Sequence, residues 1–117
     1  TEKSKYCVAF SSGSAATSAV VHILSAGDNV LCIDDVYGGT QRYFRRMVNP
    51  RMGITFDFVD FSDEANVRFK LDDAAKISAG TSERTEQNKK QRQCKTKLFW
   101  LETPTNPTMK VSDIRKV

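Results

Sequence analysis

Two polar side chains that could do chemistry follow an apolar run near the end of the chain. Glu102 and Asn106 come after residues 98–101 (LFWL), and Pro104 and Pro107 stand among them. Such a run predicts a central strand of a parallel sheet, and prolines end it because they cannot donate ladder hydrogen bonds. Ligands bind at the carboxyl edge of such sheets. A carboxylate and an amide at that edge predict one wall of a ligand site, although a strand end with a simple turn fits the same residues.

A tyrosine and an arginine stand in a second segment, residues 34–42 (DDVYGGTQR), directly after another apolar run. Tyr37 would leave the sheet with two glycines behind it, so its ring could lie flat on a planar ligand. Arg42, about one helical turn further on, could pair with an anionic group through its planar guanidinium. For this segment alone, an ordinary glycine turn with a solvated arginine is the alternative.

A helix start rich in small residues is the third segment, residues 11–17 (SSGSAAT). Gly13 permits close approach of a ligand to the backbone, and the first N–H groups of a helix have no partner inside the helix. Such groups bind phosphate. Ordinary helix capping explains the same composition, so the phosphate prediction depends on the other two segments meeting this one.

The elements that must position these residues alternate between strand and helix patterns. This alternation is typical of an α/β fold with a mostly parallel sheet and flanking helices. Because parallel strands end at one edge, the three segments would converge there. The expected strands are residues 6–10, 30–33, 54–59 and 98–101, and the expected helices are 14–24, 41–48 and 63–77.

The net charge of +4 is concentrated in one polar insert. Seven Lys or Arg and two Glu lie between Lys76 and Lys97, so the rest of the 117-residue chain is close to neutral. Residues 78–96 have too few apolar side chains to offset the entropy of ordering, and we expect a mobile loop. No aromatic residue interleaves the charges as stacking on bases requires. No nucleic-acid partner is therefore expected, and a binding module built on this insert is a minor alternative.

The three cysteines are widely spaced and include no Cys-x-x-Cys pair. Cys7 and Cys32 fall in apolar, strand-like runs, where small buried thiols are expected. This indicates a reducing compartment and no zinc site, and His22 has no second ligand at metal spacing. With no targeting signal or membrane span, the sequence predicts a cytoplasmic protein without a metal or a membrane partner.

Neither end of the chain reads as the end of a domain. Residue 1 is a threonine, and residues 114–117 fall inside a new helical pattern. A chain of 117 residues is long enough for one modest domain and too short for two. We therefore expect residues 1–117 to form part of one domain of a longer protein.

Together, the three segments resemble the Cys/Met-metabolism pyridoxal-phosphate (PLP) enzymes, which include the trans-sulfuration enzymes. The similarity lies in residues 11–17 (SSGSAAT), 35–44 (DVYGGTQRYF) and 100–107 (WLETPTNP), and it extends over nearly the whole chain outside the insert. The resemblance implies part of the large PLP-binding domain of the aspartate aminotransferase-like fold, fold type I. It also implies PLP as cofactor, a sulfur-containing amino acid as substrate and a homotetramer.

The resemblance also implies roles for single residues. The backbone N–H groups of Gly13 and Ser14 would bind the cofactor phosphate. Tyr37 would stack on the pyridine ring and assist proton transfer, so it is the candidate catalytic residue. Asn106 would bond the cofactor 3-hydroxyl or the substrate carboxylate. Arg42 would organise the pocket by pairing with Glu102.

Within the family, the similarity favours a lyase that cleaves the γ carbon–sulfur bond of cystathionine to give cysteine, 2-oxobutanoate and ammonia. Synthesis of cystathionine, its β-cleavage and sulfhydrylation of homoserine esters are alternatives that share all three motifs. A non-catalytic truncated paralogue is the alternative of another class. The Schiff-base lysine of the family and the aspartate that pairs with the pyridine nitrogen would follow residue 117, so these 117 residues alone are expected to be inactive.

Overall fold

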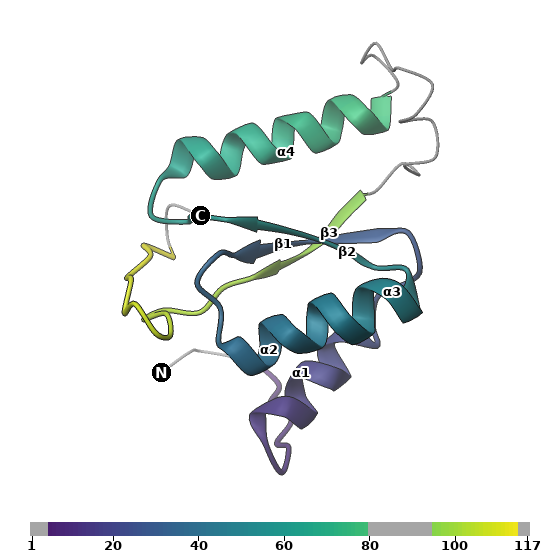
Figure 1. Ribbon diagram of the computed structural model, residues 1–117, viewed down its shortest axis with the longest axis vertical. Helices are drawn as coiled ribbons and strands as arrows, with labels where there is room; N and C mark the ends of the chain where they lie inside the picture. The colour runs from purple at the N-terminus through teal and green to yellow at the C-terminus, as the bar shows by residue number, and fades with distance from the viewer. Residues whose placement is uncertain (1–4, 80–94, 115–117) are drawn as a thin grey trace.

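A three-stranded parallel sheet forms the centre of the computed structural model, which describes residues 5–79 and 95–114 (Figure 1). The strand order is β2 (Thr55–Val59), β1 (Asp28–Ile33) and β3 (Lys95–Trp100). Both neighbours of β1 run parallel to it. The α/β architecture predicted from the alternating pattern is therefore confirmed, and all three strands end at the same edge of the sheet.

Helices lie on both sides of this sheet (Figure 1). On one side are α1 (Gly13–Val21) and a continuous helical segment made of α2 (Gly38–Tyr43), η1 (Phe44–Val48) and α3 (Asn49–Met52). On the other side is α4 (Glu64–Ala79). In the part of the chain that the structure describes, none of these helices combines the length and apolar character of a membrane span.

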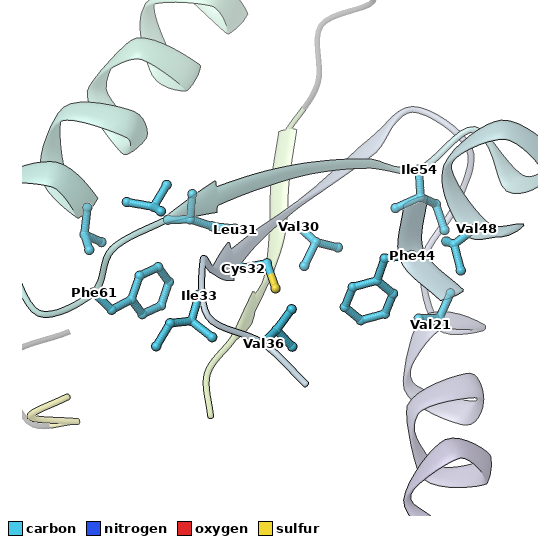
Figure 2. Close-up of a cluster of buried hydrophobic side chains, with 12 residues drawn as sticks. Val21, Val30, Leu31, Cys32, Ile33, Val36, Phe44, Val48, Ile54 and Phe61 are labelled. Atoms are coloured by element: carbon cyan, nitrogen blue, oxygen red, sulfur yellow. The ribbon is translucent and has the colours of Figure 1, made fainter. Parts of the chain in front are cut away.

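Phe44 is the largest fully buried side chain of the core. Its ring stacks on Phe56 of β2 with centroids 4.4 Å apart, and it meets Trp100 of β3 edge-on at 5.2 Å. Phe44 therefore joins η1 to both outer strands, and part of its surroundings is seen in Figure 2. The buried hydrophobic residues of the core are Val21, Val30, Leu31, Cys32, Ile33, Val36, Phe44, Val48, Ile54, Val59, Phe61 and Val67.

The helix expected at residues 41–48 begins earlier, at Gly38, and continues to Met52. Pro50 lacks an N–H and would leave a gap in a regular helical ladder. The π-helical turn η1 comes directly before it and changes the hydrogen-bond spacing, so the chain keeps a helical path through Pro50. Gly53 ends the segment with φ of 68°, a left-handed conformation that favours glycine.

A buried amide connects the three strands at their amino ends. Asn29 is 5% exposed, and its Nδ2 donates to Thr55 Oγ1 at 3.0 Å and to Asp57 Oδ2 at 3.1 Å. Its Oδ1 accepts a hydrogen bond from Thr96 Oγ1 at 3.2 Å. A buried amide is costly unless it is hydrogen-bonded, so this residue favours one register of β2 and β3 on β1.

The strand expected at residues 6–10 is absent, and this prediction is wrong. Tyr6 and Val8 are 80% and 75% exposed, because no described strand or helix covers the run. Cys7 is exposed with it, which contradicts the expected buried thiol. Cys32 is buried as predicted, and burial raises the pKa of its thiol to about 12, so it stays protonated at neutral pH.

Three further differences concern the ends and the order of elements. The strand expected to be central, β3, is an edge strand of the described sheet, and Phe99 is half-exposed; β1, buried from Asn29 to Ile33, is central instead. The first helix ends at Val21, three residues earlier than expected. The ends of the predicted loop at 78–96 belong to α4 and β3, and its remaining residues lie outside the described part.

Candidate functional site

Glu102 connects the loop after β3 to the turn after β1. Its Oε2 accepts a hydrogen bond from the backbone N–H of Tyr37 at 3.0 Å, and its Oε1 accepts one from Trp100 Nε1 at 3.1 Å. Since Trp100 packs against Phe44, the carboxylate is anchored to the core on one side. The predicted role of Glu102 as a pocket-organising group is therefore compatible with a direct bond to the Tyr37 turn.

Arg42 lies on the exposed side of α2. Within the described residues no ion pair joins it to Glu102, whose two oxygens accept from Tyr37 and Trp100. The pairing implied by the resemblance is thus not formed in this structure. Arg42 stays exposed in the last turn of α2, where its guanidinium can meet an anionic ligand.

The ring of Tyr37 lies against the first turn of α2. The side chain is 55% exposed, and a Cβ placed on Gly39 would come within 2.6 Å of Tyr37 Cε1. Only a residue without Cβ therefore leaves the ring in this place. The exposed ring leaves room for the predicted stacking on a planar ligand, which stays a prediction.

The start of α1 has two N–H groups that point to no partner. Ser12 caps the helix, and its Oγ accepts from Ala15 N–H at 3.1 Å, while Ser12 O accepts from Ala16 N–H. In the described part of the chain the N–H groups of Gly13 and Ser14 have no acceptor. These are the two groups to which the family resemblance assigns the cofactor phosphate.

A hollow of about 200 Å³ separates α1 from α2. The sequence reasoning identified Ser14 and missed the hydroxyl groups that share the hollow with it. Ser14, Thr17 and Ser18 stand three and four residues apart, a spacing that puts them on one helix face, so the signal was present. The lining residues are Ser14, Thr17, Ser18, Gly39, Thr40 and Tyr43.

Asn106 is exposed in the loop that follows β3. No hydrogen bond among the described residues joins it to Tyr37 or to the start of α1. Its neighbour Thr105 is 1% exposed and fixes the loop, because its Oγ1 accepts from Lys110 N–H at 2.8 Å and its N–H donates to Lys110 O at 2.9 Å. The structure thus brings Tyr37 and Glu102 together directly and holds Asn106 nearby through the loop backbone.

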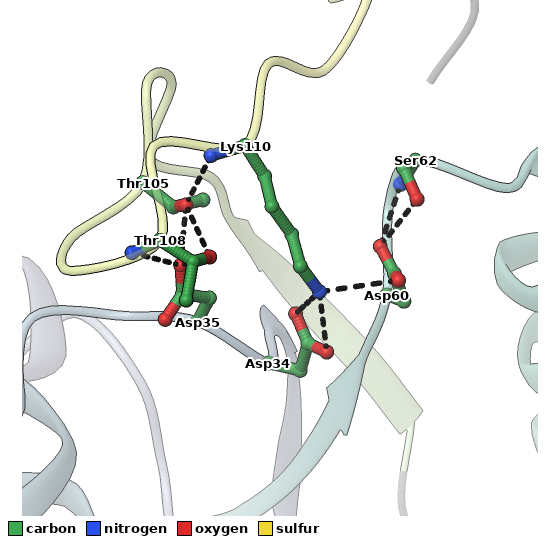
Figure 3. A network of polar contacts seen from close by, with 7 residues as sticks. All are labelled: Asp34, Asp35, Asp60, Ser62, Thr105, Thr108 and Lys110. Atoms are coloured by element: carbon green, nitrogen blue, oxygen red, sulfur yellow. Dashed lines mark hydrogen bonds and ion pairs between the residues drawn. The ribbon is translucent and has the colours of Figure 1, made fainter.

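Lys110 connects the ends of the strands, and the sequence reasoning missed it (Figure 3). Its Nζ donates to Asp34 Oδ2 after β1 at 3.1 Å and to Asp60 Oδ2 after β2 at 3.2 Å. These bonds raise the pKa of Lys110, and hydrogen bonds from Ser62 lower the pKa of Asp60. Carboxylates after two adjacent parallel strands favour a cation at that edge, and this preference was the available signal.

Comparisons with known proteins place the chain in a family. The sequence profile described as Cys/Met metabolism PLP-dependent enzyme matches residues 1–79 and 76–117. Human cystathionine gamma-lyase is 46% identical over 110 residues, which are 94% of this chain and 22% of that protein. Putative cystathionine gamma-lyase 2 of Caenorhabditis elegans is 43% identical over 116 residues, 99% of this chain and 24% of that protein. The chain therefore spans about a quarter of the length of these relatives.

The crystal structure of metB from Corynebacterium glutamicum superposes on this fold with a TM-score of 0.63 and 32% sequence identity. The match covers 92% of this chain and 23% of that one. Fold and site define part of the large domain of a PLP-dependent enzyme of fold type I. The chain belongs to the Cys/Met metabolism family of PLP-dependent enzymes, and PLP is the cofactor of that family.

The residues present fit this cofactor. The unpartnered N–H groups of Gly13 and Ser14 suit a phosphate, the exposed ring of Tyr37 suits a pyridine ring, and the hollow between α1 and α2 lies between the two segments. Gly39 keeps the ring of Tyr37 in its place. Backbone N–H groups therefore contribute to the predicted PLP site as much as the side chains do.

Gly39→Ala is expected to weaken PLP binding roughly 2- to 10-fold in the whole protein, by which we mean the polypeptide that contains residues 1–117. The added Cβ displaces the ring of Tyr37, and an aromatic stack contributes about 0.5–1.5 kcal/mol. Titration of the apoprotein with PLP, followed by absorbance, measures the change. Gly38→Ala is the matched control because its Cβ meets nothing within 4 Å. Equal affinity of the Gly39 and Gly38 variants would contradict the assigned place of the ring.

Proposed function

We propose that the whole protein is a PLP-dependent lyase that cleaves the γ carbon–sulfur bond of cystathionine and releases cysteine, 2-oxobutanoate and ammonia. The observation that carries the PLP site is the hydrogen bond from Tyr37 N–H to Glu102 Oε2, which joins two of the three motif segments at the sheet edge. The choice of reaction is supported by the similarity to cystathionine gamma-lyases over nearly the full chain.

In this proposal the first turn of α1 binds the cofactor phosphate through Gly13 and Ser14, where the partial positive charge of a helix start favours an anion. The ring of Tyr37 stacks on the pyridine ring. Asn106 donates or accepts a hydrogen bond at the cofactor 3-hydroxyl or the substrate carboxylate. Glu102 holds the backbone of Tyr37, and Arg42 offers its guanidinium to an anionic group of the substrate.

When bound, the cofactor supplies an electron sink for the carbanion chemistry of the substrate. The chain orients the reactants, and its one candidate for proton transfer among these site residues is the phenol of Tyr37. The Tyr37 residue is 55% exposed, so its side chain is accessible to a substrate. Glu102 accepts a hydrogen bond from the backbone N–H of Tyr37 and so limits the movement of the tyrosine backbone.

We further propose a homotetramer located in the cytoplasm. The similarity to the cystathionine gamma-lyases supports the assembly. Cys7 and Cys32 are both free thiols, which suits a reducing compartment.

The products of the reaction test the proposal. The purified whole protein, supplied with PLP and cystathionine, should release 2-oxobutanoate and cysteine in equal amounts. Pyruvate and homocysteine would instead identify β-cleavage. Cystathionine left intact by a PLP-loaded protein would refute the lyase proposal, and the 117-residue chain tested alone should be inactive.

A further inference from the structure

Asp35 connects the end of β1 to the loop that contains Asn106 (Figure 3). Its Oδ2 accepts hydrogen bonds from Thr105 Oγ1 at 2.5 Å and from Thr108 N–H at 3.0 Å. The hydroxyl of Thr108 donates to the same oxygen. One carboxylate oxygen thus receives three donors from a loop that lies 70 residues further along the chain.

These donors flank Asn106 in the sequence. Thr105 precedes Asn106, and Thr108 follows two positions later, so Asp35 holds the loop on both sides of the amide. Thr105 is buried and is bonded through its own backbone to Lys110. The loop is therefore closed on itself, and Asp35 fixes the closed loop against the end of β1.

Tyr37 lies two residues after Asp35, in the same turn. The backbone of Tyr37 is held by Glu102, and the Asn106 loop is held by Asp35, so two carboxylates join the two segments at two points. With Glu102 alone the segments could pivot about a single contact. A second contact removes that freedom, and it sets the separation between Tyr37 and Asn106.

We propose that Asp35 is a positioning residue that orients Asn106 relative to Tyr37 in the PLP site. This inference rests on the proposed function only in placing PLP between these residues. Hydrogen bonds from Thr105 and Thr108 lower the pKa of Asp35, which keeps the side chain an acceptor of all three bonds at neutral pH.

Asp35→Asn in the whole protein tests the inference. All three donors bind one oxygen of Asp35, and an uncharged amide oxygen accepts hydrogen bonds more weakly than a carboxylate oxygen, so the loop should be held less firmly and shift. Misplacement on the scale of 1 Å costs up to about 10²-fold in rate, and we expect kcat to fall at least about tenfold. The visible circular dichroism band of bound PLP should change as well, because it reports the orientation of the cofactor.

Asp28→Asn is the matched control. Asp28 lies at the opposite end of β1 and accepts from Ser25 N–H at 2.8 Å, so the change removes a similar charge and bond far from the site. Its kcat and spectrum should equal those of the unchanged protein. Thr108→Val removes one donor from Asp35 and serves as a milder variant, with a smaller change in the same direction, if Asp35→Asn fails to fold.

The outcomes separate the two proposals. A wild-type kcat and PLP band in Asp35→Asn, or in Thr108→Val where only that variant folds, would overturn the inference. Absence of cystathionine cleavage by the unchanged protein would refute the proposed reaction, while a changed PLP band in Asp35→Asn would still support the positioning role. Failure of the unchanged protein to bind PLP would overturn both.

Discussion

Tyr37→Phe in the whole protein is expected to retain bound PLP and to lower kcat by about 10²-fold or more. The phenyl ring keeps its place against Gly39 and can still stack on PLP. The backbone N–H of residue 37 still donates to Glu102. Only the hydroxyl is lost, and proton transfer by a positioned side chain contributes roughly 10²–10⁴-fold. Steady-state release of 2-oxobutanoate, measured at matched PLP occupancy, checks the result.

Tyr6→Phe is the control for this change, because Tyr6 is 80% exposed and lies outside the site. It should leave kcat unaltered. Equal rates for Tyr37→Phe and the unchanged protein would confine Tyr37 to stacking. Tyr37→Ala would then weaken PLP binding without a separate loss of turnover at full occupancy.

Phe44→Ala is expected to lower the free energy of unfolding by about 3–5 kcal/mol, the range for removing a buried aromatic ring. The ring is fully buried and touches aromatic side chains on both outer strands. Its loss leaves a cavity at the point where η1 meets the sheet. The midpoint of denaturant unfolding of the whole protein, with an unchanged slope, measures the effect.

Phe69→Ala provides the comparison, since Phe69 is 68% exposed on α4 and exposed substitutions usually change stability by less than about 0.5 kcal/mol. Phe44→Ala should also disturb the surroundings of Trp100, which contacts Phe44 and donates to Glu102. The near-ultraviolet circular dichroism signal of this tryptophan should therefore weaken in that variant. Similar midpoints for the two alanine variants would show that Phe44 is not central to the core.

The fold could be predicted because its main signals are local. Strands β1 and β2 are continuous apolar or alternating runs, and the parallel order follows from the helices between them. The run at Tyr6 to Phe10 has the same composition but no partner in the described residues, so it forms no strand. Apolar composition shows that a segment could be buried, but it does not show whether another segment packs against it.

The site could be predicted less completely. The sequence could propose Gly13, Ser14, Tyr37 and Glu102 as site residues because they stand at helix starts and strand ends and in motifs shared with the family, and their roles remain predictions. The implied pair of Arg42 with Glu102 is not formed, because Glu102 accepts from N–H groups instead.

The contacts of Asp35 and Lys110 could not be predicted, for a different reason. Their partners are 50 to 76 residues away in the chain, and spacing along the sequence carries no information about such contacts.

The Lys110 network also bears on the order in which the chain matures during synthesis. The ion pairs that the described structure gives Asp34 and Asp60 both lead to Lys110, which is synthesised after all three strands. A nascent chain that has emerged only as far as β2 presents both carboxylates at one edge without this counter-charge. Among the described residues, the charges of Asp34 and Asp60 are therefore paired at this edge only after residue 110 has left the ribosome.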